Sequence, residues 1–304
     1  MNIRSILITG AHHKHVKAIV RFLSGHGFDV SAFCKNKQPG SLDSLAVKVY
    51  PVDLMDPASY EDILKHQDLI IHGDTLCSFS PSDKVAMYRQ NVLGTRDLVN
   101  AALSQNVSSI LFLSDLYTLS RSSNPGLLTL NNEGNPFFFN EYCKTLFHAE
   151  LEIHRAEAEG IQTAIMHPAW LMDPSSPTEF LPARFLKASF GESTEQPYHI
   201  AWLTLPRLLD DVLSWVQRPQ WEQMPLVSGL FQLNSSPFAN QPTFWLGRSL
   251  IRLKNQLTCP TEVKNVHSLL RVPIEIPNSN QGVVLRHSSG GWEEFGKFVL
   301  NSSR

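Results

Sequence analysis

The first part of the chain constrains the fold more than any other. Residues 5–9 (Ser-Ile-Leu-Ile-Thr) form an apolar run that ends at Gly10. Apolar residues then recur at helical spacing from Val16 to Leu23. A strand, a glycine turn and an amphipathic helix in this order are typical of the start of a dinucleotide-binding βαβ unit. The glycines expected three and six residues after Gly10 are replaced here by His13 and Val16.

Strand and helix patterns alternate through the first 170 residues. Single helices separate the strands, which predicts a doubly wound α/β fold of the Rossmann type, with a parallel sheet covered by helices on both faces. Ligands of such sheets bind at the carboxyl ends of the strands, near the point where the strand order reverses. The predicted strands are 5–10, 30–33, 46–52, 68–72, 109–114 and 162–167, and the predicted helices after the first are 58–65, 84–104 and 142–159.

After Pro168 the loops lengthen and prolines become frequent. We therefore expect a Rossmann-like nucleotide-binding core at residues 1–174. Residues 175–304 are expected to form a smaller α+β substrate-covering region, interleaved with the core. Periodicity in this second region predicts helices at 207–216, 242–253 and 292–300 and a strand at 230–233.

Composition excludes several function classes. The net charge of −2 gives no electrostatic footprint for nucleic acid or for an anionic membrane. No apolar run approaches the roughly 18–20 residues that span a bilayer. The four cysteines lie far apart without metal-ligand spacing, which fits a reducing compartment. The N-terminus leads directly into a predicted core strand without a secretory pattern, so we expect a cytoplasmic protein.

Seven short motifs occur in an order and at a spacing that resemble the extended and atypical short-chain dehydrogenase/reductases, the NAD-dependent epimerase/dehydratase group. The resemblance covers about residues 5–174 and implies a Rossmann fold, a nicotinamide cofactor and a homodimer formed through helices 84–104 and 142–159. The motifs are Ile8-Thr9-Gly10-Ala11, Val52-Asp53-Leu54, Ile70-Ile71-His72, Asn91-Val92-Leu93-Gly94-Thr95, Leu113-Ser114, Tyr142 with Ala149-Glu150, and His167-Pro168 with Asp173-Pro174.

The resemblance implies five candidate cofactor residues. Gly10 and His13 lie in the loop where backbone N–H groups would meet a pyrophosphate. Lys35 follows the second strand, so it favours NADP over NAD if a dinucleotide binds. Asp53 corresponds to an adenine-contacting aspartate, although Asp-Leu is also a common turn. Asn91 belongs to the fourth motif.

The run His12-His13-Lys14-His15 permits two interpretations. These side chains replace backbone contacts to an anionic ligand, or the phosphate site has decayed and they are solvated loop residues. A histidine metal cluster is a less favoured third interpretation, because adjacent residues cannot all converge on one ion. We predict no metal site.

The resemblance also implies a tyrosine acid/base with a lysine four residues later, which lowers the tyrosine pKa. Tyr142 is the better candidate because the motifs after it then align, but Leu146 occupies the lysine position. If Lys144 is instead that lysine, Asn140 occupies the tyrosine position. The tyrosine–lysine pair is broken in both alignments. His148 is a candidate substitute base or, alternatively, a helix-surface residue.

The resemblance implies four further candidates. Ser114 matches the substrate-orienting serine, but Asp115 and Leu116 stand where hydroxyls are usual. Tyr117 is a candidate replacement for these hydroxyls. His167 and Asp173 replace an arginine and a glycine near the expected substrate pocket.

Two functions follow. The first is a diverged member of the family that has lost hydride transfer and serves as a small-molecule-binding or regulatory protein. The alternative is an active NADP-dependent reductase, epimerase or lyase that acts on a small metabolite and uses Tyr142 without the usual lysine. Either protein is expected to be a homodimer with a small-molecule ligand and no nucleic-acid or membrane partner.

Overall fold

The fold is known from a computed structural model of the chain. It describes residues 3–35, 42, 47–65, 67–78, 80–119, 135–136, 138, 140–172, 198–219, 223–226 and 229–233. Asp173, the helices expected at 242–253 and 292–300, and the rest of residues 258–304 lie outside the described residues.

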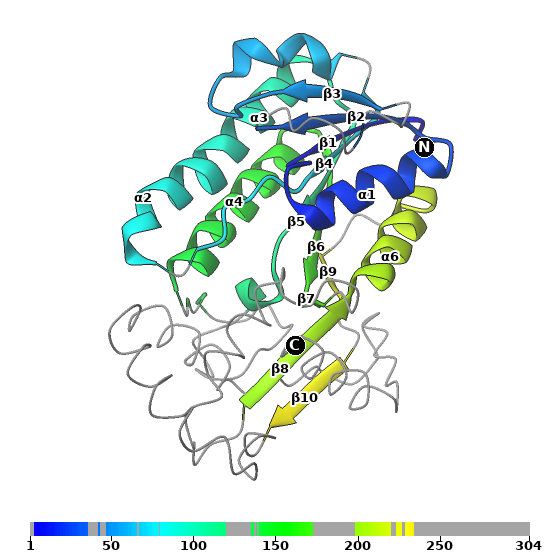
Figure 1. Cartoon of the computed structure of the whole chain (residues 1–304). Coiled ribbons are helices and arrows are strands. Elements are labelled where there is room, and N and C mark those ends of the chain that lie inside the picture. Colours follow the sequence, from blue (N-terminus) through cyan, green and yellow to red (C-terminus); the bar gives the residue numbers. More distant parts are fainter. Residues whose placement is uncertain are drawn as a thin grey trace.

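The core is a parallel sheet in which all seven strands run in the same direction (Figure 1). Its order is β3-β2-β1-β4-β5-β6-β9, so the order reverses between β1 and β4. The first six of these strands have the 3-2-1-4-5-6 order of a Rossmann-type sheet, and the predicted fold class is confirmed. The strands are β1 (Ser5–Thr9), β2 (Asp29–Cys34), β3 (Lys48–Pro51), β4 (Leu69–His72), β5 (Ser109–Leu113), β6 (Gln162–Pro168) and β9 (Gln223–Leu226).

Helices cover both faces of this sheet (Figure 1). On one face α1 (Lys14–Gly25) lies beside α6 (Leu205–Gln217), and the apolar stripe of α1 expected from the sequence is fully buried there. On the other face α3 (Gly94–Ser104) and α4 (Glu141–Ala158) pack together over a separate cluster of buried apolar side chains. Both layers bury apolar side chains against the strands, which stabilises the sheet.

The expected helix at 58–65 is wrong. Two short 3₁₀ segments, Pro57–Ser59 and Glu61–Leu64, occupy this stretch. Tyr60 separates them, since it is fully buried and its hydroxyl donates a hydrogen bond of 3.1 Å to the Leu54 carbonyl. Anchoring this ring in the core replaces the regular helical turn.

The helical stretch expected at 84–104 is present but is not uniform. It begins with α2 (Lys84–Met87), continues through a π-helical segment, Tyr88–Leu93, and ends with α3. Three consecutive residues of the π-helical segment are buried: Gln90, Asn91 and Val92. Such a wide turn directs more neighbouring side chains inward than a regular α-helix does.

A second, smaller sheet has the order β10-β8-β7. It is formed by β7 (Trp170–Met172), β8 (Tyr198–Thr204) and β10 (Gly229–Leu233), and β10 contains the strand expected at 230–233. The chain returns to the large sheet through α6 and β9, so residues beyond 174 contribute to both sheets. Among the described residues, no helix combines the length and hydropathy that a bilayer span requires.

Candidate functional site

A pocket of about 340 Å³ opens at the carboxyl ends of β1, β4, β5 and β6. This is the edge of the sheet where a Rossmann fold binds its ligand. The pocket has an apolar wall and a smaller number of polar groups. Its lining residues are His13, Lys14, His15, Gly73, Thr75, Leu76, Cys77, Leu113, Ser114, Asp115, Tyr142, Pro168, Ala169, Trp170, Leu171 and Leu208.

Two of the three candidate catalytic residues line this pocket. Ser114 follows β5, and Tyr142 lies in the first turn of α4. That helix begins where the Asn140 side chain accepts a hydrogen bond of 2.8 Å from the Cys143 backbone N–H, an N-cap that fixes the position of Tyr142. His148 does not line the pocket and instead lies beside the Phe138 ring.

The position expected for the lysine belongs to the core. Leu146 is fully buried in the cluster beneath α4, and Tyr142 packs against the edge of that cluster. Lysine at this position would place an ammonium among apolar side chains. The structure therefore explains the leucine by packing.

The groups around Tyr142 do not favour its ionisation. Burial raises the pKa of the phenol well above 10, and Cys77, Asp115 and Cys143 raise it further. A phenol in this state is protonated at neutral pH and is a poor base.

Behind the pocket a buried carboxylate gathers polar side chains from three elements. Glu150 of α4 accepts hydrogen bonds at Oε1 from the hydroxyls of Ser114 and Thr118. The Nε2 atom of His167, on β6, lies 3.2 Å from the same oxygen. Burial raises the pKa of Glu150, but the charge of His167 and the hydrogen bonds together bring it below its ordinary value. We call Glu150, Ser114, Thr118 and His167 the Glu150 cluster.

Two substrate candidates, His167 and Tyr117, are not among the residues that line the pocket. His167 is fully buried against Glu150 and does not line the pocket. Tyr117 is 1% exposed, and its ring centroid lies 5.6 Å from that of Trp170. Both side chains support the pocket wall from behind, and a substrate contact by either one stays a prediction.

Asp115 is a pocket residue that sequence reasoning did not select as a candidate. Its carboxylate accepts a hydrogen bond of 2.9 Å from the Tyr117 backbone N–H, and the residue lines the pocket. Burial raises the pKa of Asp115 to about 7, against the opposing effects of the Tyr117 N–H and His167. A carboxyl group with this pKa exchanges a proton near neutral pH.

The candidate cofactor residues have structural partners of their own. Lys35 is exposed at the end of β2, and its Nζ donates a hydrogen bond of 3.3 Å to Gln90. Exposed Asp53 accepts from the Met55 backbone N–H at 3.1 Å, which closes a turn. Cofactor roles for both stay predictions.

Asn91 is buried, and its amide is engaged on both sides. Its Oδ1 accepts from the Leu76 backbone N–H at 2.7 Å. Its Nδ2 donates to the Leu76 carbonyl at 3.0 Å and to the Thr145 hydroxyl at 2.9 Å. Asn91 thus fastens the loop after β4 to α4, and its expected cofactor contact stays a prediction.

Gly10 is required by the backbone around it. Its φ angle is +86°, and a Cβ at this position would lie 2.7 Å from the Gly73 carbonyl oxygen and 2.8 Å from the Asp74 Cα. The loop after β4 therefore packs directly on the turn after β1. This contact accounts for the glycine without a bound phosphate.

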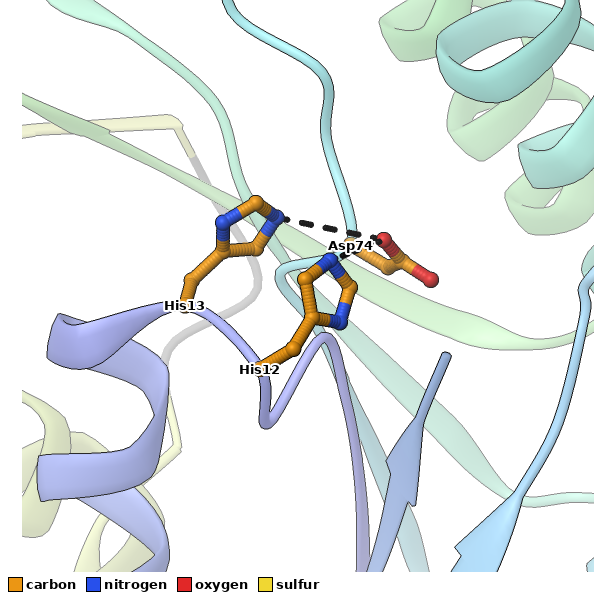
Figure 2. A group of neighbouring side chains, drawn as sticks. All are labelled: His12, His13 and Asp74. Atoms are coloured by element: carbon orange, nitrogen blue, oxygen red, sulfur yellow. Dashed lines mark ion pairs between the residues drawn. The ribbon is translucent and has the colours of Figure 1, made fainter. Parts of the chain in front are cut away.

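At the start of α1, Figure 2 shows His12 and His13 pointing toward Asp74 of the loop after β4. The Nε2 atoms of His12 and His13 lie 3.6 and 3.9 Å from Asp74 Oδ1. Burial lowers the pKa of both imidazoles, that of His13 to about 3. Burial also raises the pKa of Asp74, although His12, Lys35 and a hydrogen bond from Gln90 act in the opposite direction. We call His12, His13 and Asp74 the Asp74 cluster.

Val16 fills the space near the third expected glycine position. It is fully buried, and its Cγ2 lies 2.9 Å from the point where a Cβ on Gly73 would stand. The helix nevertheless stays on the sheet, because Gly73 has no side chain at this contact. Val16 and Gly73 are thus complementary in size.

Comparison with known proteins identifies the family. The NAD dependent epimerase/dehydratase family matches residues 6–198, which is well over half of the chain. The chain belongs to this family. Its members form part of the extended short-chain dehydrogenases/reductases and bind NAD(P), and the resemblance predicted from the motifs is confirmed.

Individual relatives are distant. Sterol demethylase protein B of Methylococcus capsulatus is 26% identical over 178 residues, which are 55% of this chain and 52% of that protein. The chain spans about half the length of the curated relatives it matches. Two solved structures share the fold. UDP-N-acetylglucosamine 4-epimerase from Methanobrevibacter ruminantium M1 has a TM-score of 0.66 at 16% identity, with 100% of both chains covered. UDP-glucose 4-epimerase from Thermotoga maritima has a TM-score of 0.65 at 14% identity, covering 97% of this chain and 96% of that one.

The residues at the strand ends do not fit a nicotinamide dinucleotide well. The buried Asp74 carboxylate and two imidazoles lie beside the turn where a pyrophosphate would need bare backbone N–H groups. At the ribose end, the leucine at position 146 offers no hydrogen-bond donor. These two departures lie on different elements.

Proposed function

We propose that this member of the family binds a small molecule in the pocket at the strand ends and has lost hydride transfer through Tyr142. The observation that carries the proposal is Leu146, which lies one helical turn after the tyrosine and is fully buried in the core. A phenol needs a nearby cation to work as a base at neutral pH. Here the neighbouring groups raise the pKa of Tyr142 instead.

The pocket itself supports a small ligand. Its volume of about 340 Å³ is near the lower end of the roughly 300–1,000 Å³ usual for ligand sites. Leu113, Trp170 and Leu208 contribute apolar surface, while Ser114 and Asp115 offer polar contacts. This combination suits a compact and partly apolar molecule with one or two polar groups.

Titration calorimetry with NAD and with NADP tests the loss of cofactor binding. We expect dissociation constants weaker than about 1 mM for both, which corresponds to about 4 kcal/mol of binding free energy. Both dinucleotides are needed because Lys35 favours NADP. Micromolar affinity for either one would contradict the proposal.

One observation favours the alternative of an active enzyme with a changed mechanism. Ser114, Asp115 and Tyr142 line the same pocket, and the pKa of Asp115 is about 7. A carboxyl group of this kind can donate a proton to a substrate oxygen near neutral pH. If turnover of a carbonyl or sugar substrate is found, it should fall at least about 100-fold in Asp115→Asn or Tyr142→Phe. Unchanged turnover in both variants would exclude these roles.

We also propose a homodimer formed through the helical stretch 84–104 (α2, the π-helical segment and α3) and α4. Three large apolar side chains are exposed on these elements, namely Val85, Tyr88 and Leu151. Size-exclusion chromatography with light scattering is expected to give twice the chain mass. Leu151→Arg should shift the protein toward the monomer, while Lys48→Glu on the edge strand β3 should not. A monomeric wild-type protein would contradict this proposal.

A further inference from the structure

Three side chains from two separate parts of the chain converge at the point where the strand order reverses. His12 and His13 belong to the turn between β1 and α1, and Asp74 belongs to the loop after β4. One ligand-type atom from each lies within 4.8 Å of the other two. Figure 2 shows both rings directed toward the carboxylate. The third group does not have to be adjacent to the histidines in sequence, because it comes from the loop after β4.

The facing groups do not form hydrogen bonds with one another. The distances from Asp74 Oδ1 to the two Nε2 atoms, 3.6 and 3.9 Å, are too long for hydrogen bonds. Among the described residues, Asp74 Oδ1 and His13 Nε2 have no hydrogen-bond partner although both atoms are buried. A buried carboxylate oxygen without a partner is costly. The arrangement therefore leaves space and unused lone pairs at its centre.

The donor set indicates the kind of ion that fits. Two imidazole nitrogens and one carboxylate oxygen suit Zn²⁺ and neighbouring divalent transition metals, whereas Mg²⁺ and Ca²⁺ prefer oxygen ligands throughout. For bonds of about 2.0–2.1 Å in a tetrahedral site, ligand atoms stand roughly 3.3 Å apart. The two nitrogen–oxygen separations exceed this value by about 0.3 and 0.6 Å, and the two histidine ligand atoms lie within 4.8 Å of each other. Small side-chain rotations would close the site.

We propose that His12, His13 and Asp74 form a binding site for one divalent transition-metal ion of the Zn²⁺ class. Three protein ligands leave a fourth position for water or for an oxygen of a bound molecule. His13 also lines the ligand pocket, so this position lies close to it. The inference does not depend on the proposed small-molecule function. The three ligands are side chains of this chain, and no bound small molecule is needed to complete them.

Surrounding contacts fix the carboxylate in place. Gln90 of the π-helical segment hydrogen-bonds to Asp74, and Lys35 donates to the same glutamine. Asn91, the next residue, fastens the loop that carries Asp74. Groups of this kind orient metal ligands and raise affinity. Asp74 is thus held from behind while its Oδ1 faces the histidines.

Metal binding tests the proposal directly. The tag-free chain is stripped with EDTA, dialysed and titrated with Zn²⁺ by calorimetry, and Co²⁺ is added separately to follow its visible absorption. We expect one ion per chain, and a tetrahedral Co²⁺ spectrum that Zn²⁺ abolishes. Zn²⁺ should also raise the melting temperature of the wild-type chain.

Variants separate this site from adventitious binding. Asp74→Asn and His13→Gln should each weaken Zn²⁺ binding at least about tenfold, since even residues behind the ligands contribute 10- to 100-fold. His15→Gln is the matched control, because His15 stacks on His13 at 5.8 Å but is not one of the three ligands. Its Zn²⁺ affinity should equal that of the wild type.

Two outcomes would overturn the proposal. One is the absence of stoichiometric Zn²⁺ or Co²⁺ binding to the wild-type chain, which would leave the three residues as a loose ion pair. The other is an equal loss of affinity in His15→Gln and His13→Gln, which would indicate binding to scattered histidines. Asp74→Asn is nearly isosteric, and its thermal unfolding without metal shows whether the variant is folded. Neither result depends on whether NAD or NADP binds.

Discussion

Two buried clusters in this molecule each place a carboxylate beside histidine. The hydrogen bonding and the pKa of the carboxylate differ between them. In the Glu150 cluster, Oε1 accepts from two hydroxyls and lies 3.2 Å from His167, and the pKa of Glu150 is lowered. In the Asp74 cluster, Oδ1 has no hydrogen-bond partner among the described residues, and burial raises the pKa of Asp74. The two sites lie at the same edge of one sheet but differ in hydrogen bonding.

The difference separates structural carboxylates from those available to a ligand. A buried carboxylate that accepts from two hydroxyls and lies beside an imidazole connects the elements that carry them, and its loss removes those contacts. A buried carboxylate oxygen that faces nitrogen atoms beyond hydrogen-bond distance is incomplete without a ligand. The Glu150 cluster therefore stabilises the fold, whereas the Asp74 cluster is the proposed metal site.

Loss of the Glu150 carboxylate should have the largest effect. Glu150→Ala leaves Ser114, Thr118 and His167 around an empty buried position, so we expect roughly 3–5 kcal/mol less unfolding free energy. Urea denaturation followed by circular dichroism measures the change. Glu150→Gln keeps the shape and an acceptor oxygen and should lose less. A change below about 1 kcal/mol for the alanine variant would show that the Glu150 carboxylate does not stabilise the fold.

A pH series should isolate Asp115, which lines the pocket. Its folded pKa of about 7 exceeds the unfolded value of 3.8, so the folded state retains a proton that the unfolded state releases. Wild-type stability from this group is therefore lost as pH rises from about 4 to about 7. The unfolding free energy of Asp115→Asn, minus that of the wild type, should increase over this range by up to about 4 kcal/mol.

The quantity to measure is the difference in unfolding free energy between Asp115→Asn and the wild type. His13, His15 and His72 have lowered pKa values and favour folding as pH rises, but they are shared by both proteins and cancel. The charge of His167 lowers the pKa of Asp115 and that of Glu150 raises it. Both residues are also present in the variant. A flat difference between pH 4 and 8 would show that the Asp115 carboxyl is not perturbed.

Asn91 tests the link between the clusters. Asn91→Ala removes three hydrogen bonds that join the loop after β4 to α4. We expect a loss of about 1–3 kcal/mol in the metal-free and ligand-free protein, because the Leu76 backbone groups lose their partner. Thermal unfolding measures it. An effect seen only with an added dinucleotide would instead support the cofactor role predicted from sequence.

The smallest effect is expected for Asp74→Asn in the presence of EDTA. Removing a buried charge whose Oδ1 lacks a partner should change the unfolding free energy by less than about 1 kcal/mol, or increase it. Glu150→Ala is measured under the same conditions, so that the changes in unfolding free energy of the two variants can be compared directly. A loss as large as that of Glu150→Ala would place Asp74 among the structural carboxylates.

Local periodicity was sufficient to predict the core. The apolar spacing from Val16 to Leu23 and the buried runs at β4 and β5 are local features, and each maps to one element. The stretch around Tyr60 was mispredicted because a tertiary contact, its hydroxyl to the Leu54 carbonyl, overrides the helical pattern. Periodicity carries no information about such a contact.

The two clusters were harder to predict because their members are distant in sequence. Glu150 meets Ser114 across 36 residues, and a glutamate within a helix usually indicates an exposed face. Asp74 did carry a signal, since it follows a buried strand and a glycine at the edge where β1 also ends. Combining that position with the histidines after Gly10 would have brought His12, His13 and Asp74 together before any coordinates were known.

The π-helical segment makes the chain length between Lys84 and Ser104 consequential. Its wide turn allows two successive amides to point inward, Gln90 toward Asp74 and Asn91 toward Leu76. Deleting one residue would restore regular α-helical geometry and rotate one of these amides away from the sheet by about 100°. The segment therefore acts as a one-residue insertion that supplies two anchors, and single-residue gaps here would distinguish relatives with this arrangement from those without it.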